Sequence, residues 1–266
     1  MTIWLRYDYA GNEGFGALEG DIVHVHCGDM LAAPTATGET LPLTEVSLLT
    51  PVVPGKFICL WNNYHAAAQK QGNAIPAEPL YLLKAPSSCL AHGQTIRVPV
   101  HYDGKVVYEG ELGIVIGRQA NNISIDQADG HIFGYTCVND VTALDLIGRD
   151  PAFAQWTRAK SFDTFGVFGP AIATGIDPAN LSVRTLLNGK ERQNYPCSDM
   201  IFSPQQLVSL ISRELTLMPG DVIACGTSLG VGVLKSGSIV EVVIDGIGSL
   251  CNPFGNPFQP TQTTTP

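Results

Sequence analysis

The chain has 266 residues, of which 45% are hydrophobic, and a formal net charge of −9 at pH 7 from 15 basic and 24 acidic side chains. Such a chain can bury a large core, and it has no basic field that would attract a nucleic-acid backbone. No stretch reaches the roughly 18 apolar residues needed to span a bilayer, and the N-terminus lacks the pattern of a signal peptide, so we expect a cytoplasmic protein with no membrane or nucleic-acid partner.

Turn-forming residues are frequent along the whole chain. The 28 glycines and 18 prolines indicate many turns, and therefore mainly β structure. The seven cysteines are scattered, odd in number and without a C-x-x-C pair. This pattern predicts reduced thiols rather than a disulfide framework or a zinc site.

The N-terminal residues 1–54 have the pattern of a small β-rich domain. Residues 3–9 and 22–26 are rich in β-branched and aromatic side chains and are separated by turn residues, which predicts short strands. Residues 33–40 contain proline, glycine and threonine and are predicted to form a loop.

A short apolar strand at residues 56–60 leads into a polar loop and a short helix. The helix is predicted over residues 65–71, because alanines follow His65 and Gly72 can end it. A strand, a polar loop and a short helix commonly form a lid, although His65 can equally be an ordinary residue of the first helical turn. The following strand, at residues 80–84, ends in Lys84, which we interpret as solvated.

Two carboxylates stand two residues apart at the start of an apolar run. Glu109 and Glu111 would point to one face of a strand, and the β-branched residues 112–116 place that strand in the core. A third carboxylate, Asp140, ends the apolar run 135–138. Three such oxygen ligands suit Mg²⁺, Mn²⁺ or Ca²⁺ better than Zn²⁺, whereas a Glu-x-Glu pair alone is more often a solvated face.

Two further polar segments follow the carboxylates. Residues 158–165 combine Lys160 and Asp163 in a short loop, which by itself is typical of an exposed, salt-bridged turn. The glycine-rich loop 226–232 follows a short apolar strand, and its backbone N–H groups could hold an anion, but it matches no nucleotide-binding pattern.

The order of these motifs resembles the fumarylacetoacetate hydrolase family, whose C-terminal catalytic domain they follow from about residue 55 to residue 252. The motifs that carry the resemblance are Gly55-Lys56-Phe57-Ile58 with Asn63-Tyr64, Tyr108-Glu109-Gly110-Glu111-Leu112, residues 134–141, residues 158–163, Asn188-Gly189 with Arg192-Gln193, and residues 219–223 with Gly226-Thr227. The resemblance implies an enzyme with an α+β fold, mainly β: a mixed β-sandwich roll with short helices and a small β-rich appendage at the N-terminus.

The resemblance also implies roles for individual residues. Mg²⁺ would be held by Glu109, Glu111 and Asp140. Lys160 would supply positive charge to a 2-oxo acid substrate, and Asp163 would orient that lysine. The substrate-binding residues would be Tyr64, Gln193, Gly226 and Thr227. Family members are usually dimers, so a homodimer is expected, with residues 55–254 as the catalytic domain and residues 255–266 as a disordered tail.

The chain departs from the family pattern at four positions. Hydrolytic members carry a His and a Glu that activate water on the lid helix, and the matching positions here are Ala67 and Lys70. Leu144 and Ile147 stand where the family has Arg and Gln. The site is therefore expected to be less cationic and more apolar, and to favour a substrate with a larger apolar end.

Three hypotheses for the activity follow. The first is Mg²⁺-dependent hydrolysis of a C–C bond in an acylpyruvate or related 2,4-dioxo acid of aromatic-compound catabolism, with His65 as a candidate base. The second is decarboxylation or isomerisation of a 2-oxo-ene-dioate of the homoprotocatechuate type, which needs no activated water. The third is a metal-binding relative whose catalysis is impaired.

Overall fold

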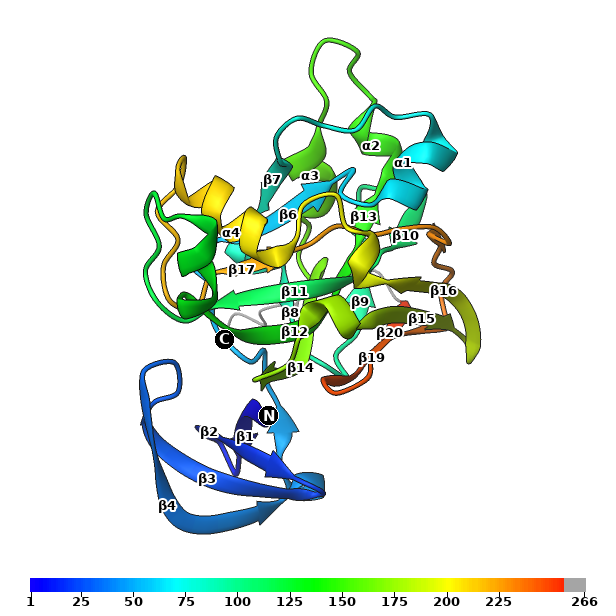
Figure 1. The fold of residues 1–266 in the computed structure, drawn as a ribbon. Helices are drawn as coiled ribbons and strands as arrows, with labels where there is room; N and C mark the ends of the chain where they lie inside the picture. Colours follow the sequence, from blue (N-terminus) through cyan, green and yellow to red (C-terminus); the bar gives the residue numbers. More distant parts are fainter. Residues whose placement is uncertain (256–266) are drawn as a thin grey trace, which may run out of the picture.

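The computed structural model describes residues 1–255, so nearly all of the predicted disordered tail lies outside the described residues. The chain is built mainly of strands, with a few short helices (Figure 1). The α-helices within residues 1–255 are α1 (His65–Gln71), α2 (Leu144–Ile147), α3 (Trp156–Lys160) and α4 (Pro204–Ser212). None of the helices formed by residues 1–255 is long and apolar enough to cross a membrane.

The strands fall into three sheets. The strands before residue 100 are β1 (Thr2–Tyr9), β2 (Asn12–Glu19), β3 (Ile22–Asp29), β4 (Ala33–Pro42), β5 (Ser47–Leu48), β6 (Phe57–Trp61), β7 (Leu80–Lys84), β8 (Cys89–Leu90) and β9 (Ile96–Arg97). The later strands are β10 (Val106–Tyr108), β11 (Gly110–Ile116), β12 (Ile132–Asp140), β13 (Thr142–Ala143), β14 (Gly166–Thr174), β15 (Ser182–Leu187), β16 (Lys190–Pro196), β17 (Val222–Ala224), β18 (Gly232–Val233), β19 (Ser238–Ile244) and β20 (Gly248–Gly255).

The largest sheet runs through the N-terminal strands and the central strands without a break. Its order is β4-β3-β2-β1-β14-β12-β11-β17-β6-β7. Outside this order, β5 pairs with β1 and β8 pairs with β14. The N-terminal strands form the lower lobe in Figure 1, and β1 joins them to the rest through antiparallel pairing with β14. A sheet of five strands, β16-β15-β19-β20-β9, and one of three, β13-β10-β18, complete the fold.

The expected loop at residues 33–40 is instead part of the strand β4. It pairs with β3 along most of its length, and its side chains are mostly exposed. Because β4 lies at the edge of the sheet, prolines that cannot donate a ladder hydrogen bond are tolerated there. The sequence prediction of a loop was wrong because composition alone does not show an available partner strand.

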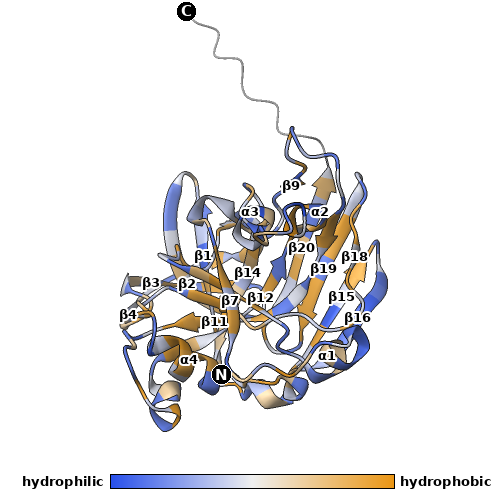
Figure 2. Ribbon diagram, turned by 90° about the horizontal axis from the view of Figure 1, so that it is seen from above, coloured by the Kyte–Doolittle hydropathy of each residue, from blue (hydrophilic) through white to orange (hydrophobic). Residues whose placement is uncertain are grey.

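The strand β11 passes through the middle of the core, as predicted. All seven of its residues are buried, and Figure 2 shows the hydrophobic residues concentrated along the strands. Leu112, Ile114 and Ile116 pack into one hydrophobic cluster, whereas Val115 packs into another on the opposite face of the sheet. This alternation follows from the two-residue period of a strand and holds β11 firmly on both sides.

Candidate active site

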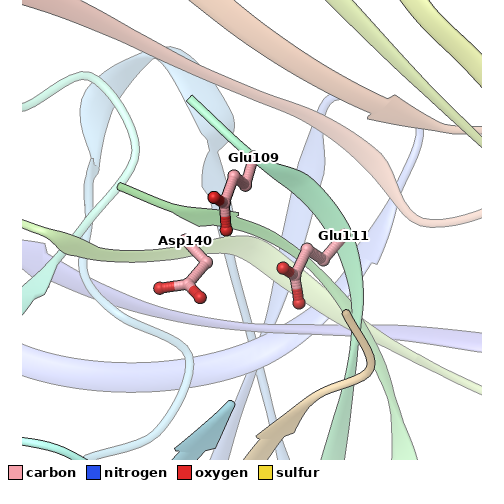
Figure 3. Close-up of side chains that lie close together, drawn as sticks. All are labelled: Glu109, Glu111 and Asp140. Carbon is pink, nitrogen blue, oxygen red and sulfur yellow. The ribbon is translucent and has the colours of Figure 1, made fainter. Parts of the chain in front are cut away.

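Three carboxylates converge where β11 and β12 lie side by side. One ligand atom from each of Glu109, Glu111 and Asp140 lies within 4.8 Å of the others (Figure 3). Antiparallel pairing of Gly110 with Asn139 places the start of β11 beside the end of β12. The two chain segments are therefore held in register by backbone hydrogen bonds, and the carboxylates they carry form one cluster.

The backbone around Glu109 is not regular strand. The strand β10 pairs with β13 and β18, whereas β11 belongs to the large sheet, and Glu109 stands between the two strands. Its N–H donates to Asn139 Oδ1 at 3.0 Å, and its carbonyl accepts from the N–H of Asp140 at 2.8 Å. The expectation that both glutamates lie in one strand is therefore wrong for Glu109, although its side chain still meets the other two carboxylates.

Two lysines contact the carboxylates. Lys160, the last residue of α3, places its Nζ 2.6 Å from Glu109 Oε2 and also pairs with Asp140 Oδ2. Lys84, the last residue of β7, pairs with Asp140 Oδ1 and donates to the carbonyl of Val141 at 3.3 Å. Lys84 is fully buried, so our interpretation of it as a solvated lysine was wrong.

The sequence pattern of β7 did not reveal that Lys84 is buried. Along β7, Leu82 and Lys84 are buried whereas Leu80 and Leu83 are exposed, so Lys84 follows Leu82 onto the inner face. Because leucines occupy both faces of this strand, its hydrophobic pattern does not reveal which face is buried. The lysine could be placed only once β7 was paired with β6.

Burial and charge shift the ionisation of these groups. Burial, with the nearby charge of Asp140, raises the pKa of Glu111 well above its usual range and also raises that of Glu109. Burial opposes ionisation of Asp140 as well, but the ammonium groups of Lys160 and Lys84 outweigh it and lower its pKa. The same carboxylates overcome the effect of burial on Lys160 and raise its pKa, so this lysine stays charged.

The cluster fits a divalent cation with a preference for oxygen ligands. The N–H of Gly226 donates to Glu111 Oε2 at 2.7 Å, and the other oxygen of this carboxylate is buried without a hydrogen-bond partner among the described residues. Three carboxyl groups face two ammonium groups, and a bound cation would relieve the repulsion from Asp140 and Glu109 that, with burial, raises the pKa of Glu111. Carboxylate oxygens of this kind suit Mg²⁺, Mn²⁺ or Ca²⁺.

Gln193 and Thr227 support the start of β11. The side-chain carbonyl of Gln193 accepts the N–H of Gly110 at 3.0 Å, and its amide donates to Thr227 Oγ1 at 2.9 Å. The Thr227 hydroxyl in turn donates to the carbonyl of Gly110 at 2.9 Å. Gln193 is buried with its polar atoms bonded to Gly110 and to the loop after β17, and it does not line the cavity beside the cluster.

Three of the predicted site residues form no hydrogen bond or ion pair with the carboxylates among the described residues. Tyr64 is fully buried and packs edge-on against Tyr195, with ring centroids 4.9 Å apart. His65 is exposed at the first position of α1. Asp163 is also exposed and lines a different cavity, and among the described residues the ion-pair partners of Lys160 are Glu109 and Asp140.

A cavity of about 210 Å³ opens beside the carboxylate cluster. Its polar end contains Glu109, Lys160 and Thr227. The full set of lining residues is Leu60, Trp61, Asn62, Ala67, Gln71, Glu109, Leu144, Ile147, Trp156, Lys160, Thr227 and Val231. Three of the four positions that depart from the family pattern are in this set, and Lys70, the fourth, is exposed outside it.

Comparison with known proteins settles the family. The model of the fumarylacetoacetate (FAA) hydrolase C-terminal domain matches residues 56–255. The chain belongs to the fumarylacetoacetate hydrolase family. The predicted family membership and the predicted mainly β fold with short helices are thus confirmed. A second family model, Rv2993c-like N-terminal, matches residues 4–51.

Proteins similar to this chain are named after different reactions. It is 39% identical to oxaloacetate tautomerase YisK of Bacillus subtilis, over 80% of this chain and 74% of the relative. The crystal structure of 2-hydroxyhepta-2,4-diene-1,7-dioate isomerase from Mycobacterium marinum matches with a TM-score of 0.88 and 37% identity, covering 96% of this chain and 98% of that one. Maleylpyruvate hydrolase from Sphingobium sp. SYK-6, solved with manganese(II) and pyruvate, has a TM-score of 0.79 and 25% identity, covering 97% and 100%.

Proposed function

We propose that this chain is a divalent-metal-dependent isomerase that interconverts the enol and keto forms of a 2-oxo acid. One observation carries the proposal: Glu109 of the carboxylate cluster and Lys160 line the cavity, but among the described residues its lining contains no histidine and no acidic side chain besides Glu109. Ala67 lines the cavity at the position of the family's lid histidine, and His65 is exposed outside it. Enol–keto conversion requires a polarised 2-oxo acid but no attack by water.

The residues present suit this reaction. When bound, a divalent cation on Glu109, Glu111 and Asp140 would withdraw electrons from a 2-oxo acid and make its C3–H bond more acidic. The Lys160 ammonium, held in place by Glu109 and Asp140, would favour negative charge on the C2 oxygen. The hydrogen bonds of Gln193 and Thr227 to Gly110 keep this end of the cavity rigid.

A proton must move between the C2 oxygen of the enol and C3. The cavity reaches the surface, because Leu144 and Val231 line it and are each about 40% exposed (41% and 40%). Solvent water can therefore take the proton from the enol oxygen and return one to C3. In D₂O, deuterium is accordingly expected at C3 of the keto product.

The names of two relatives support this proposal, since one is an oxaloacetate tautomerase and one a dienedioate isomerase. A third relative is named a maleylpyruvate hydrolase. Hydrolysis of a C–C bond, however, requires a side chain that activates water. The cavity lining places no such histidine beside the carboxylates. The residues in the cavity therefore fit an isomerase better than a hydrolase.

The test is the decay of a 2-oxo acid enol, followed by ultraviolet absorbance with the enzyme and Mg²⁺. The expected result is faster decay to a keto product of unchanged mass, and loss of the effect with EDTA or in Glu111→Gln. Two acid products would establish hydrolysis, and released CO₂ would establish decarboxylation. No acceleration of any substrate, despite metal binding, would establish an impaired relative and refute the proposal.

A further inference from the structure

The cavity beside the carboxylate cluster is charged at one end only. Among its lining residues in the described part of the chain, the charged ones are Glu109 and Lys160, which contact each other. Lys70 of α1 and Arg158 of α3 are exposed and do not line the cavity. A second carboxylate on a bound acid would therefore meet no positively charged side chain other than Lys160 in the cavity lining.

The rest of the lining, here called the apolar end, consists mainly of aromatic and aliphatic side chains and also includes Asn62 and Gln71. Trp61 and Trp156 lie with ring centroids 5.5 Å apart and planes tilted by 49°. Leu144 and Ile147, from the first and last positions of α2, complete this wall with Val231. Such a surface favours a compact apolar group, and aromatic rings pack well against tilted tryptophans.

We infer that the substrate is a monocarboxylic 2-oxo acid whose C3 carries one uncharged apolar group, such as an aromatic ring. This inference rests on the proposed isomerase function and names its substrate class. The volume of about 210 Å³ limits the group to a compact one, because pockets for drug-sized ligands span roughly 300–1,000 Å³. The carboxylate and 2-oxo group would lie toward Lys160, and the apolar group would contact the tryptophans.

Because of its apolar lining, we expect this site to prefer a monocarboxylic acid with an apolar group over a dicarboxylic acid. A well-matched apolar contact discriminates by roughly 10- to 200-fold, and a carboxylate in the same place would replace that contact. We therefore expect kcat/KM for an aryl pyruvate enol to exceed that for oxaloacetate enol by at least about tenfold.

The experiment compares the enols of phenylpyruvate and oxaloacetate with the whole chain and Mg²⁺. Each enol is diluted from an aprotic solvent, and its decay is followed by ultraviolet absorbance against the same buffer without protein. Faster decay of phenylpyruvate enol, at least about tenfold in kcat/KM, supports the inference. Equal or greater activity on oxaloacetate refutes the inference alone, whereas acceleration of neither acid refutes the proposed isomerase.

A matched pair of variants tests the wall directly. Leu144→Arg places a cation at the apolar end, and Leu144 is 41% exposed, so the longer side chain can be accommodated. The variant should shift the ratio of kcat/KM values toward oxaloacetate by at least about tenfold. Ile125→Arg adds the same charge at a residue that is 47% exposed and outside the cavity, and it should leave the ratio unchanged.

A binding measurement keeps the inference testable if Leu144→Arg folds poorly. Phenylpyruvate added to the Mg²⁺-loaded protein should quench tryptophan fluorescence, because Trp61 and Trp156 lie at the apolar end. The quenching should shrink in the double variant Trp61→Phe/Trp156→Phe. Unchanged quenching in that variant, or an unchanged substrate ratio in a well-folded Leu144→Arg, would overturn the inference.

Discussion

Lys84 and Asp140 form an ion pair in which neither side chain is exposed to solvent. The two residues are 56 positions apart in the chain, and β11, β17 and β6 lie between β12 and β7 in the order of the large sheet. Lys84 therefore holds one oxygen of Asp140 while Lys160 holds the other. The carboxylate is fixed from two sides before any ligand arrives.

Removing the Lys84 charge should destabilise the folded protein. The substitution Lys84→Met leaves Asp140 with one cationic partner in a buried environment, and breaking a buried pair typically costs about 3–5 kcal/mol. Urea unfolding in EDTA measures the change in the free energy of unfolding. Lys70→Met, at an exposed position of α1, is the control and should change it by less than about 0.5 kcal/mol. A loss below about 1 kcal/mol in Lys84→Met would contradict the role of the pair.

Adding one methyl group at Gly110 should disturb the carboxylate cluster. A Cβ at this position would lie 2.0 Å from Thr185 Oγ1, so the Thr185 side chain must rotate or β11 and β15 must move apart. Gly110→Ala should cost about 1–3 kcal/mol of stability and weaken Mn²⁺ binding, measured by thermal unfolding and calorimetry.

Two comparisons check the cause of that effect. Gly130→Ala introduces a methyl group where no atom lies within 4 Å, and it should be tolerated. Removing the clashing hydroxyl with Thr185→Ala should recover part of the loss in Gly110→Ala. If the double variant is no better than the single one, crowding against Thr185 is not the reason.

Loss of a carboxylate charge should weaken metal binding. Glu111→Gln keeps the side-chain shape but removes the charge from a buried oxygen that has no hydrogen-bond partner among the described residues. Because changes to groups behind a metal ligand cost roughly 10- to 100-fold in affinity, loss of the ligand charge itself should cost at least about 100-fold. Titration with Mn²⁺ measures the affinity, and Glu78→Gln, at an exposed residue, should bind as the unaltered protein does.

One histidine outside the site should contribute to sensitivity to acid. Burial lowers the pKa of His92, whose Nδ1 accepts the N–H of Cys251 at 3.2 Å. The unfolded chain then binds a proton more readily than the folded one, with a pKa of about 6.5. Stability is therefore full above this value and is lost as the pH falls through it toward the folded pKa. The denaturation midpoint should fall less between pH 7.5 and pH 5.5 in His92→Asn, and an equal fall would exclude His92 as a cause.

The sequence by itself was sufficient to predict the family, the mainly β fold and the residues of the carboxylate cluster. This was possible because Glu109, Glu111, Asp140 and Lys160 stand in short motifs, each set by local strand or loop geometry. The same motifs place Ala67 where the resemblance to the family leads us to expect the lid histidine.

The tertiary structure decided what surrounds those residues. Lys84 joins Asp140 only through the pairing of distant strands, and Trp61 meets Trp156 across nearly a hundred positions of sequence. His65 faces solvent because it begins α1 on the side away from the cavity that Ala67 lines. Contacts between distant segments depend on sheet order and helix orientation, which local sequence patterns do not encode.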